Sequence, residues 1–298
     1  MSKLVECVPN FSEGQRQEVI DAIIGAARET PGVKVLDWSS DPSHNRTVLT
    51  FVGEPEPVRE AAFACCKRAA ELIDMDRHRG AHPRVGATDV LPFVPVSDVT
   101  MEECVALAHG LGRDIGEKLS IPVYFYEAAA KRGSMRSLPD VRRGEYEGLK
   151  EAIGTPERAP DEGPSVMPKA GATVVGARPF LIAFNINLAT PDVALAKRIA
   201  QTIRAAKGGY VNCRAIGLAL EDRGITQVSI NMTDYTSTPL HRVFETVRSE
   251  AARYGVSVVG SEIIGLTPMQ ALLDAADFYL RLEGFRREQV LEARLLEE

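Results

Sequence analysis

Residues 76–89 carry the densest group of side chains in this chain that could move protons and bind anions. The stretch contains His78 and His82, two of the five histidines, with three arginines and an aspartate at each end. A histidine accepts and donates protons near neutral pH, and an arginine holds a carboxylate by paired hydrogen bonds. The stretch lacks apolar periodicity and lies between a helical pattern and an apolar run, so we expect a loop that connects a helix to a strand. The alternative is a charged loop that is merely solvated.

His82 is the leading candidate for proton transfer. Pro83 restricts the backbone of His82 to extended conformations, and Gly80 and Gly86 would let a ligand come close to the backbone. His44, in the turn 41–46, is a weaker candidate. The acids that could orient His82 are Asp37, Asp41, Asp76 and Asp89, and the sequence does not choose among them.

Motifs for metals and nucleotide cofactors are weak or missing. Residues 110–116 resemble a dinucleotide-binding loop only in their glycines, because their spacing is wrong and they lie inside a helical pattern. The histidines do not pair with cysteines at zinc spacing, and Gly80 and Pro83 argue against a helix that would bring His78 and His82 onto one metal. We therefore expect no metal and no nucleotide cofactor.

Composition excludes several classes of partner. The 298 residues, 45% hydrophobic, are enough for one large domain or two smaller ones. Net charge is −6 with scattered basic residues, which does not fit a nucleic-acid surface. No apolar run reaches membrane-spanning length, and the N-terminus lacks the apolar core of a signal peptide. Five cysteines without a CxxC pair indicate a cytoplasmic chain with reduced thiols, and Cys65 and Cys66 are expected to fill the core.

Apolar periodicity divides the chain into two similar halves. The first reads βαββαβαβ and the second βαββαβ, so each contains the ferredoxin-like order. We expect an α/β (α+β) fold of two ferredoxin-like sandwiches, residues 1–178 and 179–298. Capping boxes are predicted at Ser12 and Thr100. The expected strands are 4–8, 33–37, 47–52, 90–96, 121–126, 180–188, 210–220, 225–232 and 256–264.

Two further features concern ligand binding. Residues 132–171 are rich in proline and charge and are expected to be irregular, as either a functional segment or a linker. In the strands 181–188 and 225–232, apolar residues alternate with amides and hydroxyls. The polar faces would line a groove if the two sheets face each other; the alternative is an open, solvated sheet face.

Five motifs in order along the whole chain resemble glutamate formimidoyltransferases. They are the segments 7–14 (CVPNFSEG), 45–48 (NRTV), 82–87 (HPRVGA), 171–178 (GAT and GAR) and 181–188 (LIAFNINL). The resemblance implies two ferredoxin-like subdomains with a folate tunnel between their sheets, and a homodimer. It implies transfer of the formimino group from N-formimino-L-glutamate to N5 of tetrahydrofolate, the co-substrate, in histidine degradation.

The resemblance also implies site residues. The catalytic histidine of the family matches His82. Animal members carry an acid where Ser39 stands here, so Asp37 or Asp41 is expected to serve as partner of His82. The folate-binding stretch of the family matches Pro160, Asp161, Glu162, Gly163, Pro164, Ser165, Val166, Met167, Pro168 and Lys169. This stretch has fewer aromatic residues than in animal members, and Lys169 could meet the glutamate tail of folate.

Animal members continue into a cyclodeaminase domain, whereas this chain ends after its last helix. We therefore expect no deaminase activity and a product that passes to a separate enzyme.

The residue types fit this chemistry independently of the resemblance. N5 must lose a proton as it attacks the amidine carbon, and the leaving amine must gain one, so a single histidine could do both in turn. The donor has two carboxylates, for which the candidate ligands are Asn10, Arg46, Arg79, Arg84 and Arg178. One alternative is transfer of a formyl group from N-formylglutamate, giving 5-formyltetrahydrofolate. Another is a folate-binding module without turnover.

Overall fold

The computed structural model describes residues 3–295, and the chain divides into two compact units. Unit 1 is Met1–Pro179 and unit 2 is Phe180–Glu298. Each unit has its own sheet and its own hydrophobic core. The α/β class and the two sheets confirm the fold class expected from the sequence, while the tunnel between the sheets stays a prediction.

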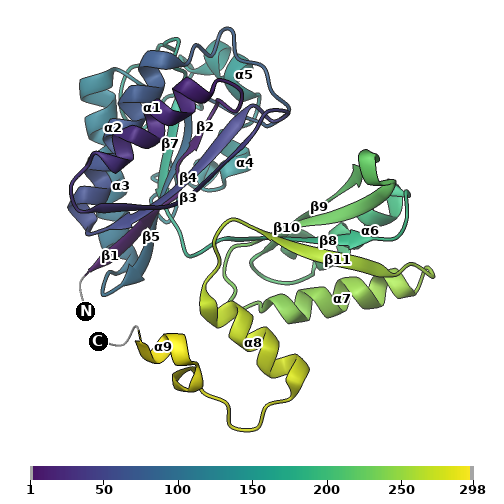
Figure 1. Ribbon diagram of the computed structural model, residues 1–298. Helices are drawn as coiled ribbons and strands as arrows, with labels where there is room; N and C mark the ends of the chain where they lie inside the picture. The colour runs from purple at the N-terminus through teal and green to yellow at the C-terminus, as the bar shows by residue number, and fades with distance from the viewer. Residues whose placement is uncertain (1–2, 296–298) are drawn as a thin grey trace. The chain divides into compact units, whose positions relative to one another are not determined.

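Unit 1 is built on a seven-stranded sheet (Figure 1). Its strands are β1 (Leu4–Cys7), β2 (Asn10–Phe11), β3 (Val33–Asp41), β4 (Arg46–Gly53), β5 (Thr88–Ser97), β6 (Val123–Glu127) and β7 (Thr173–Ala177). Strands β1 and β2 are two parts of one strand position, because both pair antiparallel with β4 and β5. The order β3, β4, β1/β2, β5 is the ferredoxin-like order. Strands β7 and β6 extend it by parallel pairing beyond β5.

Helices cover one face of this sheet along its length. They are α1 (Gln17–Arg28), α2 (Pro55–Leu72) and α3 (Met101–Leu119), and Figure 1 shows them side by side. Their apolar faces bury Ile23, Cys65 and Leu111 against strand residues such as Phe51 and Phe93. All five cysteines are free and buried, and Cys65 and Cys66 lie in this core, as the sequence predicted.

The segment 132–171 is irregular only in part: the prediction holds for residues 153–171 but was wrong for residues 133–152. It forms a 3-10 turn (Gly133–Met135), α4 (Leu138–Val141) and α5 (Glu145–Ala152). Val141 and Leu149 are buried with Tyr124 and Val174 in a second core on the other sheet face. Each helix has only a few apolar positions, so sequence periodicity could not detect it. Strand β7 was also missed, because its five residues are a short apolar run without alternation.

Unit 2 is a four-stranded antiparallel sheet of order β11, β8, β10, β9 (Figure 1). This is the ferredoxin-like order that the sequence predicted. The strands are β8 (Ile182–Leu188), β9 (Cys213–Leu220), β10 (Ile225–Met232) and β11 (Val258–Ile264). The helices are α6 (Val193–Ile203), α7 (Leu240–Ala252), α8 (Met269–Leu280) and α9 (Leu291–Leu295), with 3-10 turns at Ala205–Lys207, Glu221–Arg223 and Arg287–Gln289.

The two faces of the unit 2 sheet differ in chemistry. Ile186 and Val228 pack with α6 and α7 in the core. On the other face, the Gln227 amide donates to Asn187 Oδ1 at 2.9 Å and to Glu262 Oε1 at 2.7 Å. The alternation read from the sequence is therefore confirmed, while the groove that the polar face would line stays a prediction.

Helix starts were predicted with mixed success. The capping box of Thr100 and Glu103 opens α3 as expected. Ser12 does not cap α1, which begins at Gln17; instead the Glu13 carboxylate accepts from the backbone N–H groups of the two residues before α1. The Ser12 hydroxyl donates to the carbonyl of Gly86 at 2.7 Å. This hydrogen bond joins Ser12, the residue after β2, to the loop before β5 that contains His78 and His82 (residues 76–87), which is called the histidine loop below.

Candidate functional site

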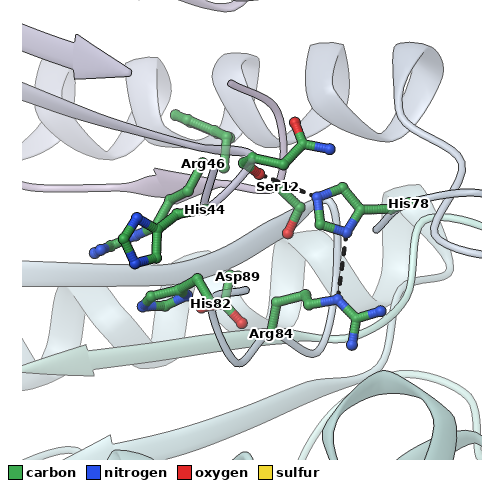
Figure 2. Close-up of a pocket in the computed structure, with 9 residues that line it drawn as sticks. Ser12, His44, Arg46, His78, His82, Arg84 and Asp89 are labelled. Atoms are coloured by element: carbon green, nitrogen blue, oxygen red, sulfur yellow. Dashed lines mark hydrogen bonds between the residues drawn. The ribbon is translucent and has the colours of Figure 1, made fainter. Parts of the chain in front are cut away.

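A cavity in unit 1 lies where the histidine loop, the end of β2 and the start of β4 meet (Figure 2). These segments are adjacent because β2 pairs with both β4 and β5, and the loop leads into β5. The residues that line the cavity are Phe11, Ser12, His44, Asn45, Arg46, His78, His82, Arg84 and Asp89.

Close backbone contacts fix the loop on both sides of His82. A Cβ on Gly86 would collide with the carbonyl oxygen of Ala172, and a Cβ on Gly80 with that of His44. Ala87 N donates to Ala170 O at 2.7 Å beside this contact. The two glycines are therefore required by packing of the chain on itself, while a role in letting a ligand come close stays a prediction.

His78 supports the cavity wall. Its side chain is buried, its Nε2 lies 3.0 Å from Asn45 O, and its Nδ1 accepts from Arg84 Nε at 3.3 Å. This pattern requires the tautomer with a proton on Nε2. Burial lowers the pKa of His78, so the ring stays neutral. With both nitrogens in use, His78 has no free site for proton exchange.

Arg84 is held by the chain's own carboxylates. Its guanidinium donates to Glu145 at 2.8 Å and to both oxygens of Glu147 at 2.8 and 2.9 Å. These hydrogen bonds lower the pKa of Glu147 to about 2. Arg84 was predicted to bind the donor's carboxylates, but here it ties the histidine loop to the first turn of α5.

Arg46, at the start of β4, has the properties of an anion ligand. It donates from Nη2 to Asn10 Oδ1, and Asn10 Nδ2 donates in turn to Val8 O at 3.0 Å. Its Nε atom is buried and has no hydrogen-bond partner among residues 3–295. Burial, with the charge of Arg142 as the next cause, lowers the pKa of Arg46 to about 10. A buried cation of this kind favours a bound carboxylate.

Arg142 does not line the cavity itself but pairs with Asp89, which does, and the sequence did not predict this contact. It follows α4 and donates to Asp89 Oδ2, while Asp89 Oδ1 accepts from Val85 N at 2.8 Å. The Nε of Arg142 is also buried and lacks a partner within the described part of the chain. Its distance in sequence from the histidine loop left no local signal, since only the fold of the segment 132–171 brings it there.

His82 is a neutral imidazole in this environment. Burial, followed by the charges of Arg46 and Arg142 and by His44, lowers its pKa to about 3. The unprotonated ring can therefore accept a proton at pH 7. Its centroid lies 6.3 Å from that of His44 in an edge-to-face arrangement, and Figure 2 shows the two rings next to each other.

The two acids proposed as partners of His82 lie in different places. Asp41 Oδ2 is 2.6 Å from Nδ1 of His44, so the structure pairs it with His44. Asp37 lies on β3 opposite Thr50 and is not among the residues that line the cavity.

The remaining predicted ligands lie outside the His82 cavity. Arg79 lines a neighbouring cavity of about 460 Å³, and donates to His78 O at 2.7 Å. Arg178 follows β7 and donates to Pro179 O at 3.0 Å. The stretch 160–169 begins along β6, where Val123 N donates to Glu162 O at 2.9 Å. It ends where Lys169 O accepts from Met75 N at 2.8 Å.

Residues 3–295 contain no group of three or more His, Cys, Asp or Glu side chains placed to hold a metal ion. No helix in this range is both long enough and apolar enough to cross a membrane.

Two ferredoxin-like units, with a neutral histidine and buried guanidinium groups in one cavity, define an α/β enzyme whose site suits acid–base chemistry on an anionic substrate. Residues 4–178 match the model of the formiminotransferase domain, N-terminal subdomain, and residues 183–294 match that of the formiminotransferase domain. The chain therefore belongs to the formiminotransferase family.

Three curated relatives are similar to this chain over almost its whole length. A glutamate formimidoyltransferase of Streptococcus pyogenes serotype M1 is 50% identical over 99% of this chain and 100% of its own length. One of Thermoplasma acidophilum is 51% identical over 98% of this chain and 97% of its own. The formimidoyltransferase-cyclodeaminase of Gallus gallus is 51% identical over 95% of this chain, which spans 53% of that protein.

Proposed function

We propose that this protein transfers the formimino group from N-formimino-L-glutamate to N5 of tetrahydrofolate, giving 5-formiminotetrahydrofolate and L-glutamate in histidine degradation. The observation that carries the proposal is a neutral His82 beside Arg46, whose buried Nε lacks a partner in the described chain. The names of relatives that match almost the whole chain support the same reaction.

Each residue has a chemical task in this proposal. Arg46 and Arg142 bind a carboxylate of the donor, and Asn10 orients the guanidinium of Arg46. His82 accepts the N5 proton as the nitrogen attacks the amidine carbon. A bound carboxylate would offset the two cationic charges that lower the pKa of His82, so substrate binding makes this histidine a stronger base.

The folate portion of the proposal concerns the stretch 160–169. We propose that it contacts the co-substrate, with the exposed Lys169 near the glutamate tail. Arg79 and Arg178 stay candidates for the distal carboxylates. A cytoplasmic homodimer that needs no metal completes the proposal.

An absorbance assay for 5-formiminotetrahydrofolate tests the reaction directly. Wild-type protein should form this product from N-formimino-L-glutamate and tetrahydrofolate. H82Q should fold normally and lose about 10²- to 10⁴-fold in turnover, because it lacks the proton acceptor. A rate near that of wild type would remove His82 from the mechanism.

The same assay separates the alternative donor. N-formyl-L-glutamate should react far more slowly than the formimino donor. A preference for the formyl donor would assign the protein to 5-formyltetrahydrofolate formation. Tight folate binding with no turnover of either donor would instead indicate a binding module.

A further inference from the structure

We propose that His44 is a second proton-transfer residue of this cavity, which donates the proton that the leaving glutamate nitrogen needs, and that Asp41 positions it. The inference rests on the proposed function and divides its proton transfers between two histidines.

The turn between β3 and β4 builds a defined position for His44. Asp41 Oδ1 accepts from the backbone N–H groups of Ser43 at 2.8 Å and of His44 at 2.9 Å. The other oxygen of Asp41 lies 2.6 Å from His44 Nδ1. Gly80 packs closely against the carbonyl oxygen of His44. Since Asp41 occupies Nδ1, the Nε2 of His44 is the nitrogen left for proton exchange.

The two histidines differ in their surroundings. The ring of His82 is half-buried and faces the charges of Arg46 and Arg142. The side chain of His44 is 51% exposed and is paired with a carboxylate. The Asp41 carboxylate orients the His44 ring, and the exposure of that ring allows proton exchange with solvent, while the two guanidinium groups beside His82 disfavour a protonated ring there. His82 therefore suits the task of proton acceptor, and His44 that of proton donor with access to bulk water.

The proton balance closes with two histidines. As N5 forms its bond to the amidinium carbon, neutral His82 takes the N5 proton and leaves a tetrahedral carbon with three nitrogens. Protonated His44 then donates to the glutamate nitrogen, and the carbon–nitrogen bond breaks with its electron pair on that nitrogen. The products are a formimino group on N5 with its amidinium charge, neutral glutamate amine, protonated His82 and neutral His44. His82 then loses a proton to water and His44 regains one.

A change of leaving group distinguishes a proton donor from a merely structural residue. The donors to compare are N-formimino-L-glutamate and its 4,4-difluoro analogue, because fluorine makes the leaving amine less basic and less dependent on protonation. The variants are H44Q, D41N and H82Q, with D21N on the exposed face of α1 as the control for an acid-to-amide change.

With the natural donor, H44Q should lose about 10²-fold or more in kcat, with little change in the KM for tetrahydrofolate. With the difluoro donor, the loss should shrink at least tenfold. D41N should show a smaller loss with the same dependence on the donor, and because asparagine can also cap the turn, it tests the inference even if H44Q folds poorly. H82Q should be impaired with both donors, and D21N should match wild type.

Each outcome has a separate meaning. If wild type turns over neither donor, the proposed function fails, and this inference fails with it. If wild type is active and H44Q stays within about twofold of it, only the role of His44 fails. An equal loss in H44Q with both donors would also overturn the role, since it would show that His44 merely shapes the cavity.

Discussion

At the scale of single residues, hydrogen-bond partners give three neighbouring histidines different tasks. His78 uses both ring nitrogens within the protein, and His44 has one nitrogen paired with Asp41. Burial, together with two neighbouring guanidinium groups, holds the pKa of His82 low. The same side chain thus serves as support, proposed donor and proposed acceptor because its surroundings differ.

The pH behaviour of His82 can be observed by NMR of labelled histidine rings, with its signal assigned by comparison with H82Q. The ring should stay neutral from pH 8 to pH 5, because its pKa is about 3. Adding L-glutamate should raise that pKa, since carboxylates offset the charges of Arg46 and Arg142. An unliganded pKa near 6.5 would contradict the described environment.

The depressed pKa also affects stability. The unfolded chain binds a proton at His82 below about pH 6.5 and the folded chain does not, so stability falls as pH falls from 6.5 toward 3. At pH 5 the effect of this half-exposed ring should be about 1 kcal/mol after solvent screening. H82Q should accordingly lose less stability than wild type between pH 7 and pH 5, as measured by urea unfolding.

Arg46 offers a test of carboxylate binding. R46K keeps the charge but lacks the planar pair of donors, so the KM for the formimino donor should rise about 10- to 100-fold. The KM for tetrahydrofolate should change much less. R28K, at the exposed end of α1, is the matched control. An unchanged donor KM in R46K would exclude Arg46 as a donor ligand.

At the scale of elements, the segment with α4 and α5 holds the histidine loop in place. Arg84 in the loop pairs with Glu145 and Glu147 in the first turn of α5. Asp89 at the start of β5 pairs with Arg142 after α4. Both ion pairs join residues that are about 50 to 60 positions apart in the sequence. This segment therefore acts as a brace for the cavity, where the sequence had suggested a linker or an irregular functional stretch.

Removing one carboxylate from this brace should destabilise the protein in a pH-dependent way. E147Q should reduce the free energy of unfolding by about 1 kcal/mol at pH 6. The pKa of Glu147 is lowered to about 2 by Arg84, so its contribution is complete above about pH 4.5 and is lost as pH falls toward 2. The difference from wild type should therefore shrink at pH 3. E151Q, on the exposed side of α5, is the control, and an E147Q effect independent of pH would argue against an ionic tie.

At the scale of the whole molecule, each unit buries its own core. Ile186 is fully buried in unit 2, and Ile23 in the main core of unit 1. The single tryptophan, Trp38, lies on β3 in unit 1. Its fluorescence therefore reports on unit 1, whereas far-ultraviolet circular dichroism reports on both units.

Separate cores predict separable unfolding. I186A should cost about 2–5 kcal/mol in unit 2 through lost burial and a residual cavity. The circular dichroism transition should broaden or shift downward, while the Trp38 fluorescence midpoint stays near that of wild type. I23A, as the matched variant of unit 1, should move the fluorescence midpoint. Equal shifts of both signals in I186A would show that the two units unfold as one cooperative body.

The sequence predicted those elements whose pattern lies within one continuous segment, and it missed those that depend on contacts with distant segments. The long helices α1, α2 and α3 and the alternating strands of unit 2 were found, because periodicity is carried by neighbours in sequence. Strand β7 and helices α4 and α5 were missed, since each is too short to show a period. Strand β7 owes its place to parallel pairing with β5 and β6, which its own residues do not reveal.

The sequence by itself determined the class of fold, the loop that contains His82, and the family to which the chain belongs, because periodicities and motifs are local. Only the tertiary structure decided which side chains meet in the cavity. It placed Arg142 beside Asp89 and paired Arg84 with Glu147. It also paired Asp41 with His44 instead of with His82. The physical reason is that burial and charge depend on contacts between distant segments. Those contacts distinguish the supporting His78 from the proposed donor His44 and the proposed acceptor His82.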